Sequence, residues 1–189
     1  MSIVLGTDTI TGIAVGGLPS GVITHSEIGY PGCIVQTVTT LTRTATSYSG
    51  PITGNGTSID ALNMTITPRK AGNKIIIKWM LGGESTDNNV VYTITRNDVL
   101  LADASNAANN RWAGIGHGQY DNNFSSTPLN DAILFVDDAC LGTTSTYKLC
   151  FRSSNGTARV FWLNRTVGSA GADNNETGVS SGVLYEVHV

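Results

Sequence analysis

The chain has 189 residues and a net charge of −3, and charged residues make up only 13 % of it, against about 25 % in an average domain. This balance gives no support to binding of a nucleic-acid backbone, which requires clustered positive charge. Hydrophobic residues reach 40 %, which is enough for a core and too many for a disordered chain. No run approaches the roughly 20 apolar residues of a membrane span, and the first residues lack the basic segment of a signal peptide.

The composition predicts an all-β protein. Thr, Val and Ile are frequent and favour strands, whereas Gly, Asn, Asp and Ser supply the turns between them. The chain contains 22 glycines and no convincing amphipathic helix pattern. We therefore expect short strands separated by turns, packed as a β-sandwich.

Residues 1–32 form a separate segment, which we call the arm. Its hydrophobic residues follow no sustained period of 2 or 3.6, and the segment is too short to close a core of its own. At about 3.3 Å per residue the arm could extend on the order of 100 Å. We predict that it anchors the protein or intertwines with other chains through Ile3, Val4, Leu5, Ile10, Ile13, Val15, Leu18, Val22 and Ile23.

Residues 33–189 predict one β-sandwich domain of nine or ten strands. Apolar residues also recur from 59 to 66, before Pro68, and Asn97 with Asp98 predicts a tight turn. The last strand reaches the C-terminal residue, which we expect to be tied into a sheet. The other expected strands are 33–38 with a Thr-rich continuation to 47, 74–81, 90–96, 99–102, 132–136, 146–152, 158–164 and 183–189.

Three cysteines leave at least one thiol unpaired, so the sequence predicts no disulfide framework. Free thiols in a reducing cytoplasm are the simpler interpretation. The alternative is that Cys140 and Cys150 face each other across a hairpin.

The order of several short motifs resembles a known family. These motifs are PGCIVQTV at 31–38, ITP at 66–68, NKIII at 73–77, YTITRN at 92–97, TYK at 146–148, VFWLNR at 160–165 and LYEV at 184–187. Together they resemble the C-terminal domain of tail-fibre and other virion-surface proteins of tailed bacteriophages, many of which infect cyanobacteria. The resemblance implies an antiparallel, TNF-like jelly roll that forms a homotrimer on the particle. The chain lacks the long shaft of many fibres, which leaves room for a capsid decoration protein.

Catalytic motifs find little support. The sequence GVSSG at 178–182 matches a nucleophile elbow in letters, but a strand follows it instead of a helix, so we interpret it as a turn. Asp137 and Asp138 are neighbours on an expected strand and should point to opposite faces. We predict that the protein is not an enzyme.

No metal or cofactor is expected. The three histidines, His25, His117 and His188, do not have the spacing of zinc ligands. The tripeptide Asp-Asn-Asn occurs at 87–89, 121–123 and 173–175. Such loops supply the oxygen ligands that Ca²⁺ prefers, but the same residues form turns through hydrogen bonds to their own backbone, which is the interpretation we favour.

The aromatic residues fall into two groups. Trp79, Tyr147 and Trp162 lie in expected strands and are predicted to fill the core or a subunit interface. A second group interrupts a polar stretch between 105 and 130, and aromatic residues among Asn, Gly and Ser are typical of recognition surfaces. The alternative is that the loop folds back and buries them, with His117 an ordinary loop residue or a metal ligand on a three-fold axis. The candidate receptor or glycan recognition residues are Trp112, His117, Tyr120 and Phe124.

These observations favour a non-enzymatic structural protein of a phage virion, specifically a short trimeric tail fibre with an outward-facing host-recognition head. Its expected partners are further copies of itself, a baseplate, tail-hub or major capsid protein, and a host surface glycan or protein. Nucleic acid and membrane insertion are not expected. The protein is predicted to be assembled in the bacterial cytoplasm and to lie on the virion surface. The alternatives are a capsid decoration protein and a lectin-like carbohydrate-binding module.

Overall fold

The structure is a computed structural model that describes residues 31–51, 54–86, 89–101, 106–107, 111–112, 114–118, 128–155, 157–168 and 176–189. Residues 1–30, which include every predicted contact residue of the arm, lie outside this range. So do Tyr120, Phe124 and most of the three Asp-Asn-Asn tripeptides. The predictions that concern them stay predictions.

The described residues form an all-β structure with one short 3₁₀ helix, η1 (Asp60–Leu62). The strands are β1 (Ile34–Thr42), β2 (Thr46–Gly50), β3 (Thr57–Ser58), β4 (Met64–Ile66), β5 (Lys74–Ser85), β6 (Val90–Arg96), β7 (Val99–Leu100), β8 (Asn106–Ala107), β9 (Arg111–Trp112), β10 (Gly116–His117), β11 (Leu129–Asp137), β12 (Ser145–Ser153), β13 (Arg159–Leu163) and β14 (Ser180–Val187).

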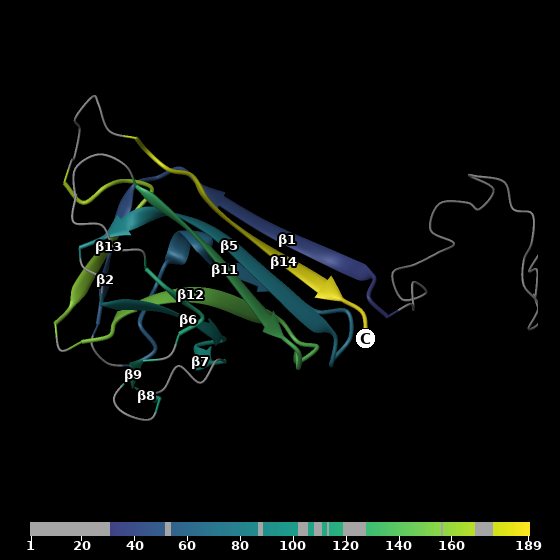
Figure 1. Ribbon diagram of the computed structural model, residues 1–189. Helices are drawn as coiled ribbons and strands as arrows, with labels where there is room; N and C mark the ends of the chain where they lie inside the picture. Colours follow the sequence, from purple (N-terminus) through teal and green to yellow (C-terminus); the bar gives the residue numbers. More distant parts are fainter. Residues whose placement is uncertain are drawn as a thin grey trace, which may run out of the picture.

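Two antiparallel sheets pack face to face (Figure 1). In the first sheet β5 is central. It pairs with β11 along one edge and with β14 and then β13 along the other, while β1 pairs with β14 and β2 with β13. The second sheet has the order β10–β6–β12–β3, with β4 also on β12 and β7 on β6. We call these the β5 sheet and the β12 sheet.

The core lies between the two sheets and follows from strand alternation. Inward positions of β5 carry Ile75, Ile77, Trp79 and Leu81, all almost fully buried. The Trp79 indole N–H donates to the carbonyl oxygen of Leu62 at 3.2 Å, which satisfies its one polar atom. Beside them in the same sheet lie the buried Phe161, Leu163 and Leu184 of β13 and β14. Across the core lie buried residues of the β12 sheet, namely Tyr92, Ile94, Tyr147, Leu149 and Phe151.

The predicted core positions of Trp79 and Tyr147 are confirmed, since both are fully buried. Trp162 instead points outward from β13 and is half-buried, with the Arg165 guanidinium 4.3 Å from its ring centre. The free-thiol prediction is also confirmed, because Cys33, Cys140 and Cys150 are all unpaired.

The strand predictions hold for the long strands and differ at their ends. Nine strands of three or more residues are present in the described ranges, and the remaining five have two residues each. The last strand begins earlier than expected, at Ser180, and ends at Val187. The apolar stretch 59–66 is η1 followed by β4, not one strand. Asn97 and Asp98 form the predicted tight turn, with positive φ angles of 50° and 66°, as hairpin turns of the primed types require.

The C-terminus is tied to the β5 sheet as expected. The backbone N–H of His188 donates to the carbonyl of Cys33 at 2.9 Å, and the N–H of Gly32 donates to the carbonyl of His188 at 2.8 Å. The chain therefore enters the domain beside its own C-terminus. In the described ranges, no helix is both long enough and apolar enough to cross a membrane.

Candidate functional site

The outer surface of the β5 sheet carries a concentration of exposed apolar side chains. We define the open face as the outward positions of β1, β14, β11 and the Lys74–Met80 part of β5. Of nine exposed large hydrophobic residues in the described ranges, five lie here, with exposed fractions from 43 % to 60 %: Ile34, Leu41, Met80, Leu134 and Val136. Ile76, Val183, Tyr185 and Val187 lie between them and are half-buried.

Strand register places these residues side by side. Leu134 is opposite Lys78, Val136 is opposite Ile76, and Ala132 is opposite Met80 across the β11–β5 pair. On the other edge of β5, Val183 is opposite Lys78 and Tyr185 is opposite Ile76. Directly opposite side chains on one face of a sheet stand about 5 Å apart. The residues therefore make a continuous surface across four strands.

The open face contains positive but no negative charge. Its only charged positions in the described ranges are Lys74 and Lys78, both exposed. Glu186 of β14 points inward, where its Oε1 accepts from the backbone N–H of Arg69 and from Asn73 Nδ2, each at 2.7 Å.

The acidic residues of β11 and of the far end of β5 are also held away from the open face. Asp131 Oδ2 accepts from the Tyr92 hydroxyl at 3.1 Å, and the buried Asp137 accepts from the Tyr147 hydroxyl at 2.7 Å. Glu84 is buried and its Oε2 accepts from the backbone N–H of Val167 at 2.7 Å. The two lysines are therefore left on this face without a carboxylate on the described strands around them.

A groove of about 510 Å³ is hollowed into the open face where β1, β14 and β5 meet. Its lining combines apolar side chains with hydroxyl groups and one ammonium group. The lining residues are Thr39, Thr40, Leu41, Lys78, Met80, Ser181, Gly182, Val183 and Tyr185.

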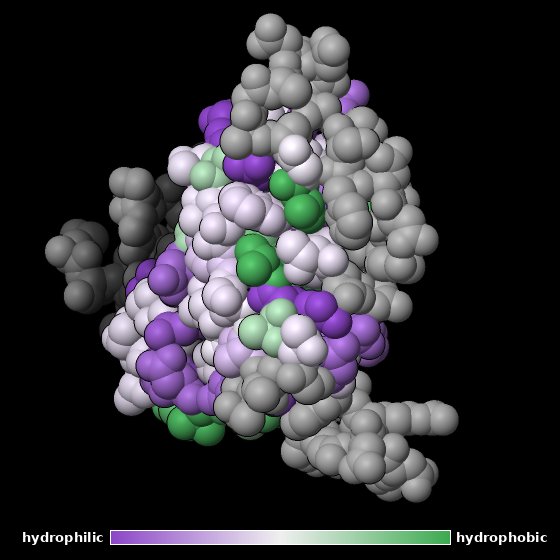
Figure 2. All heavy atoms as spheres, turned by 90° about the vertical axis from the view of Figure 1, so that its left-hand side faces the viewer, coloured by the Kyte–Doolittle hydropathy of each residue, from purple (hydrophilic) through white to green (hydrophobic). Residues whose placement is uncertain are grey.

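The end of the sandwich formed by β13 and β2 is different. Figure 2 shows this end covered mostly by weakly polar residues, with strongly hydrophobic ones in small separate groups. The outward Trp162 of β13 is covered by Arg165. The exposed apolar surface is therefore a property of the open face and not of the β5 sheet as a whole.

The predicted recognition residues are only partly located. His117 is exposed on β10, opposite Val91 of β6. Trp112 lies in β9, opposite Asn106 of β8. Tyr120 and Phe124 lie outside the described residues, so the grouping of the four residues stays a prediction.

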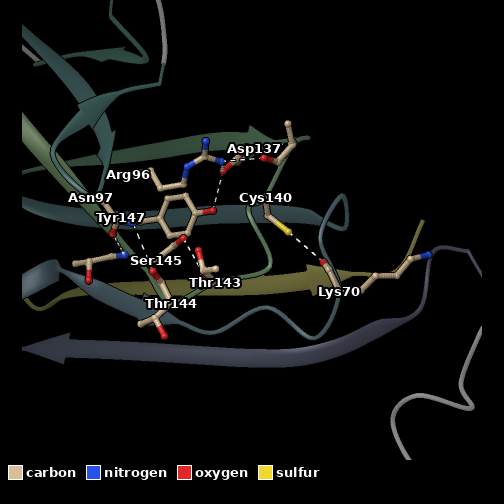
Figure 3. Close-up of polar contacts among 11 residues, drawn as sticks. Lys70, Arg96, Asn97, Asp137, Cys140, Thr143, Thr144, Ser145 and Tyr147 are labelled. Carbon is tan, nitrogen blue, oxygen red and sulfur yellow. Dashed lines mark hydrogen bonds and ion pairs between the residues drawn. The ribbon is translucent and has the colours of Figure 1, made fainter.

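Asp137 lies in a buried polar cluster at the end of β11 (Figure 3). Its Oδ2 accepts from Arg96 Nη1 at 2.6 Å and from the Tyr147 hydroxyl, and its Oδ1 accepts from the backbone N–H of Ala139 at 3.2 Å. Burial, followed by the hydrogen bond and charge of Asp137, raises the pKa of Tyr147. Asp138 is exposed. The adjacent carboxylates therefore do not share a site, and Asp137 fixes β6, β11 and β12 together.

Ser180 is placed as a structural residue. Its hydroxyl donates to Asn164 Oδ1 at 2.7 Å and accepts from the backbone N–H of Gly82 at 2.9 Å. It begins β14 and is fully buried, so the segment 178–182, which the sequence predicted as a turn, instead carries the start of the last strand. The described residues also contain no group of three His, Cys, Asp or Glu side chains placed to hold a metal ion.

No family model matches the chain, and no curated protein matches it. The sequence analysis did not predict which residues form the open face. Its signal is that β5 and β11 carry apolar residues at consecutive positions, as at Ile75–Ile76–Ile77, instead of alternating with polar ones. Such runs are typical of strands covered on both faces.

Proposed function

We propose that this chain is a non-enzymatic structural protein of a phage virion, a short trimeric tail fibre whose head faces the host. The observation that carries the proposal is the open face, an apolar surface spanning four strands with no acidic residue on it. Monomeric proteins rarely leave contiguous apolar patches of this kind exposed, and such patches mark protein–protein contacts. The open face is the surface through which the subunits would trimerise.

The strand order supports a jelly roll as the finer description of the fold. The first and last long strands, β1 and β14, are neighbours. Apart from β13 and the two-residue strands, the strands from β4 to β14 alternate between the β12 sheet (β4, β6, β12) and the β5 sheet (β5, β11, β14). This alternation between two antiparallel sheets is what two Greek keys in a jelly roll produce. The number of subunits, three, rests on the resemblance to virion-surface domains.

The size of the open face fits a stable interface. Four strands about 4.8 Å apart, each contributing about eight residues at a rise of about 3.3 Å, give a flat footprint of roughly 19 by 26 Å. The accessible surface of its side chains is larger than this footprint. A standard interface buries about 800 Å² per partner, so the whole face is of the right order to serve one.

Light scattering on the purified protein tests the oligomer. One chain has a mass of 19.8 kDa, so a trimer has three times this mass. We expect trimers both for the full chain and for residues 33–189, since the open face belongs to the domain. A monomeric full chain at micromolar concentration contradicts the proposal.

Electron microscopy of labelled particles tests the location. A tail fibre places the label at the tail or baseplate, and loss of residues 1–32 is expected to abolish attachment. A label spread over the head identifies the alternative, a capsid decoration protein. The second alternative is the lectin-like module. Glycan-array binding that is lost in Trp112→Ala or Tyr120→Ala favours it.

A further inference from the structure

The groove in the open face has features that select one occupant from this chain. It is lined by Leu41, Met80 and Val183, and its one charged group is the Lys78 ammonium. An occupant must therefore offer aliphatic side chains and a carboxylate. Residues 1–30 have this composition: they are rich in Ile, Val and Leu, they contain Asp8 and Glu27, and they contain neither Lys nor Arg.

Chain length brings one of these carboxylates within reach. The described chain enters at Gly32 and Ile34, beside the C-terminal end of β14. Ile34 is opposite Val187 and Lys78 is opposite Val183, so Lys78 lies four residues along β14 from the entry point and two strands across. This separation is roughly 16 Å. Seven residues separate Glu27 from Ile34, which span up to about 23 Å when extended.

We infer that residues 22–30 of the arm fold back onto the open face of their own chain and occupy the groove, with the Glu27 carboxylate paired to the Lys78 ammonium. Val22, Ile23 and Ile28 supply the aliphatic contacts on either side of Glu27. Tethering favours this occupant over a separate peptide, because a short linker gives an effective concentration in the millimolar range. Residues 1–21 remain available for attachment to the particle.

Docking of the arm covers the β1 and β14 part of the open face, so the surface left for a subunit contact would be the docked arm together with the β5 and β11 part. The groove lies on the β1 and β14 side, whereas Ile76, Leu134 and Val136 lie on the β5 and β11 side and do not line it. The inference concerns contacts within one chain, so it does not require the trimer of the proposed function. The inference gives residues 22–30 of the arm a binding site on the domain, in addition to the anchoring role predicted for the arm.

A charge exchange in the full-length protein tests the pairing, with hydrogen exchange of residues 18–30 read by mass spectrometry. We expect the arm to be protected in the original chain and to exchange roughly fivefold faster in Lys78→Glu and in Glu27→Lys, as expected for an ion pair at the upper end of exposed pairs. The double variant Lys78→Glu with Glu27→Lys restores protection. Lys74→Glu, which makes the same charge change on the same strand outside the groove, leaves the arm protected.

Two results would overturn the inference. One is an arm that exchanges at the rate of a free peptide in the original chain. The other is an arm whose protection does not change in either single variant, or is not restored in the double one. Light scattering on the same samples separates this question from the oligomer: a trimer with an unprotected arm contradicts only the docking, and a monomer with a protected arm contradicts only the trimer.

Discussion

The two sheets of the sandwich differ in the side chains on their outer surfaces and in what covers them. The outward side chains of the β12 sheet are mostly polar, and the loop that contains Gly54 and Asn55 covers part of them. Thr93 Oγ1 donates to the carbonyl of Asn55 at 2.5 Å, and Arg152 Nη1 donates to the carbonyl of Gly54 at 2.6 Å. Thr93 and Arg152, which make these contacts, are buried, and so are Val91 and Cys150 on the same side of the sheet.

The open face of the β5 sheet has no such cover among the described residues. Its most exposed side chains are aliphatic, and its polar ones are two lysines and the hydroxyl groups of β1 and β14. A loop carries backbone polar groups that must be paired when buried, so polar outward residues suit a loop and aliphatic ones suit another apolar surface. The difference shows that the chemistry of the outward positions, and not burial alone, indicates what kind of cover a sheet receives.

The largest effect is expected from placing a charge on the uncovered sheet. Leu134→Glu changes a side chain that is 60 % exposed, so the domain should still fold. Burying its carboxylate at a subunit contact costs several kcal/mol, and we expect the mass to fall from that of a trimer to 19.8 kDa. Val99→Glu is the matched control, because Val99 is an exposed apolar residue of β7 outside the open face. A trimer that survives Leu134→Glu contradicts the assigned interface.

The next largest effect concerns the loop over the β12 sheet. Gly56 has a φ of 97°, and a Cβ added there would lie 2.8 Å from the carbonyl oxygen of Phe151. We expect Gly56→Ala to lower the free energy of unfolding by about 3 kcal/mol, from backbone strain and this clash together. Gly54→Ala has a similar φ of 72° with open space around it, so it should cost only about 1 kcal/mol. Equal shifts of the two denaturation midpoints would show that the loop is not packed as described.

Cys150, on the outward side of the same sheet, makes the free energy of unfolding depend on pH. Burial raises the pKa of its thiol from 9.0 to about 11. Its contribution to stability is therefore complete below pH 9, where the thiol is neutral in both states, and is lost as the pH rises from 9 to 11 because only the unfolded chain ionises. Two pKa units correspond to about 2 to 3 kcal/mol.

Chemical denaturation at a series of pH values measures this contribution. We expect the fall in unfolding free energy between pH 9 and pH 11 to be smaller in Cys150→Ala than in the original chain. Cys33→Ala removes a thiol that lies outside the covered face and serves as the control. Parallel pH profiles for Cys150→Ala and the original chain would mean that water reaches Cys150.

The long strands could be predicted from the sequence, whereas the surface that several strands form together could not. The turn at Asn97 and Asp98 and the strands around Trp79 and Tyr147 could be predicted, because turn-forming residues and runs of strand-favouring residues are local properties of the sequence. The 3₁₀ helix η1 within 59–66 was not predicted, and one contact that holds it, from the Trp79 indole N–H to the Leu62 carbonyl, comes from the distant strand β5. The open face could not be assembled from the sequence either, since Leu134, Ile76 and Tyr185 meet only through the register of β11, β5 and β14.

The smallest predicted effect tests the covered end of the β5 sheet. The Arg165 guanidinium lies 4.3 Å from the centre of the Trp162 ring, a cation–π contact worth about 0.5 to 1 kcal/mol. Arg165→Gln should lower the unfolding free energy by about that amount and alter the tryptophan fluorescence, whereas Arg165→Lys, which keeps the cation, should show a smaller change. Because Trp162 belongs to the same sheet as the open face but has its cover within the chain, Arg165→Gln should leave the oligomer mass unchanged. A change in mass would extend the subunit contact to β13 and remove the distinction between the covered and uncovered parts of this sheet.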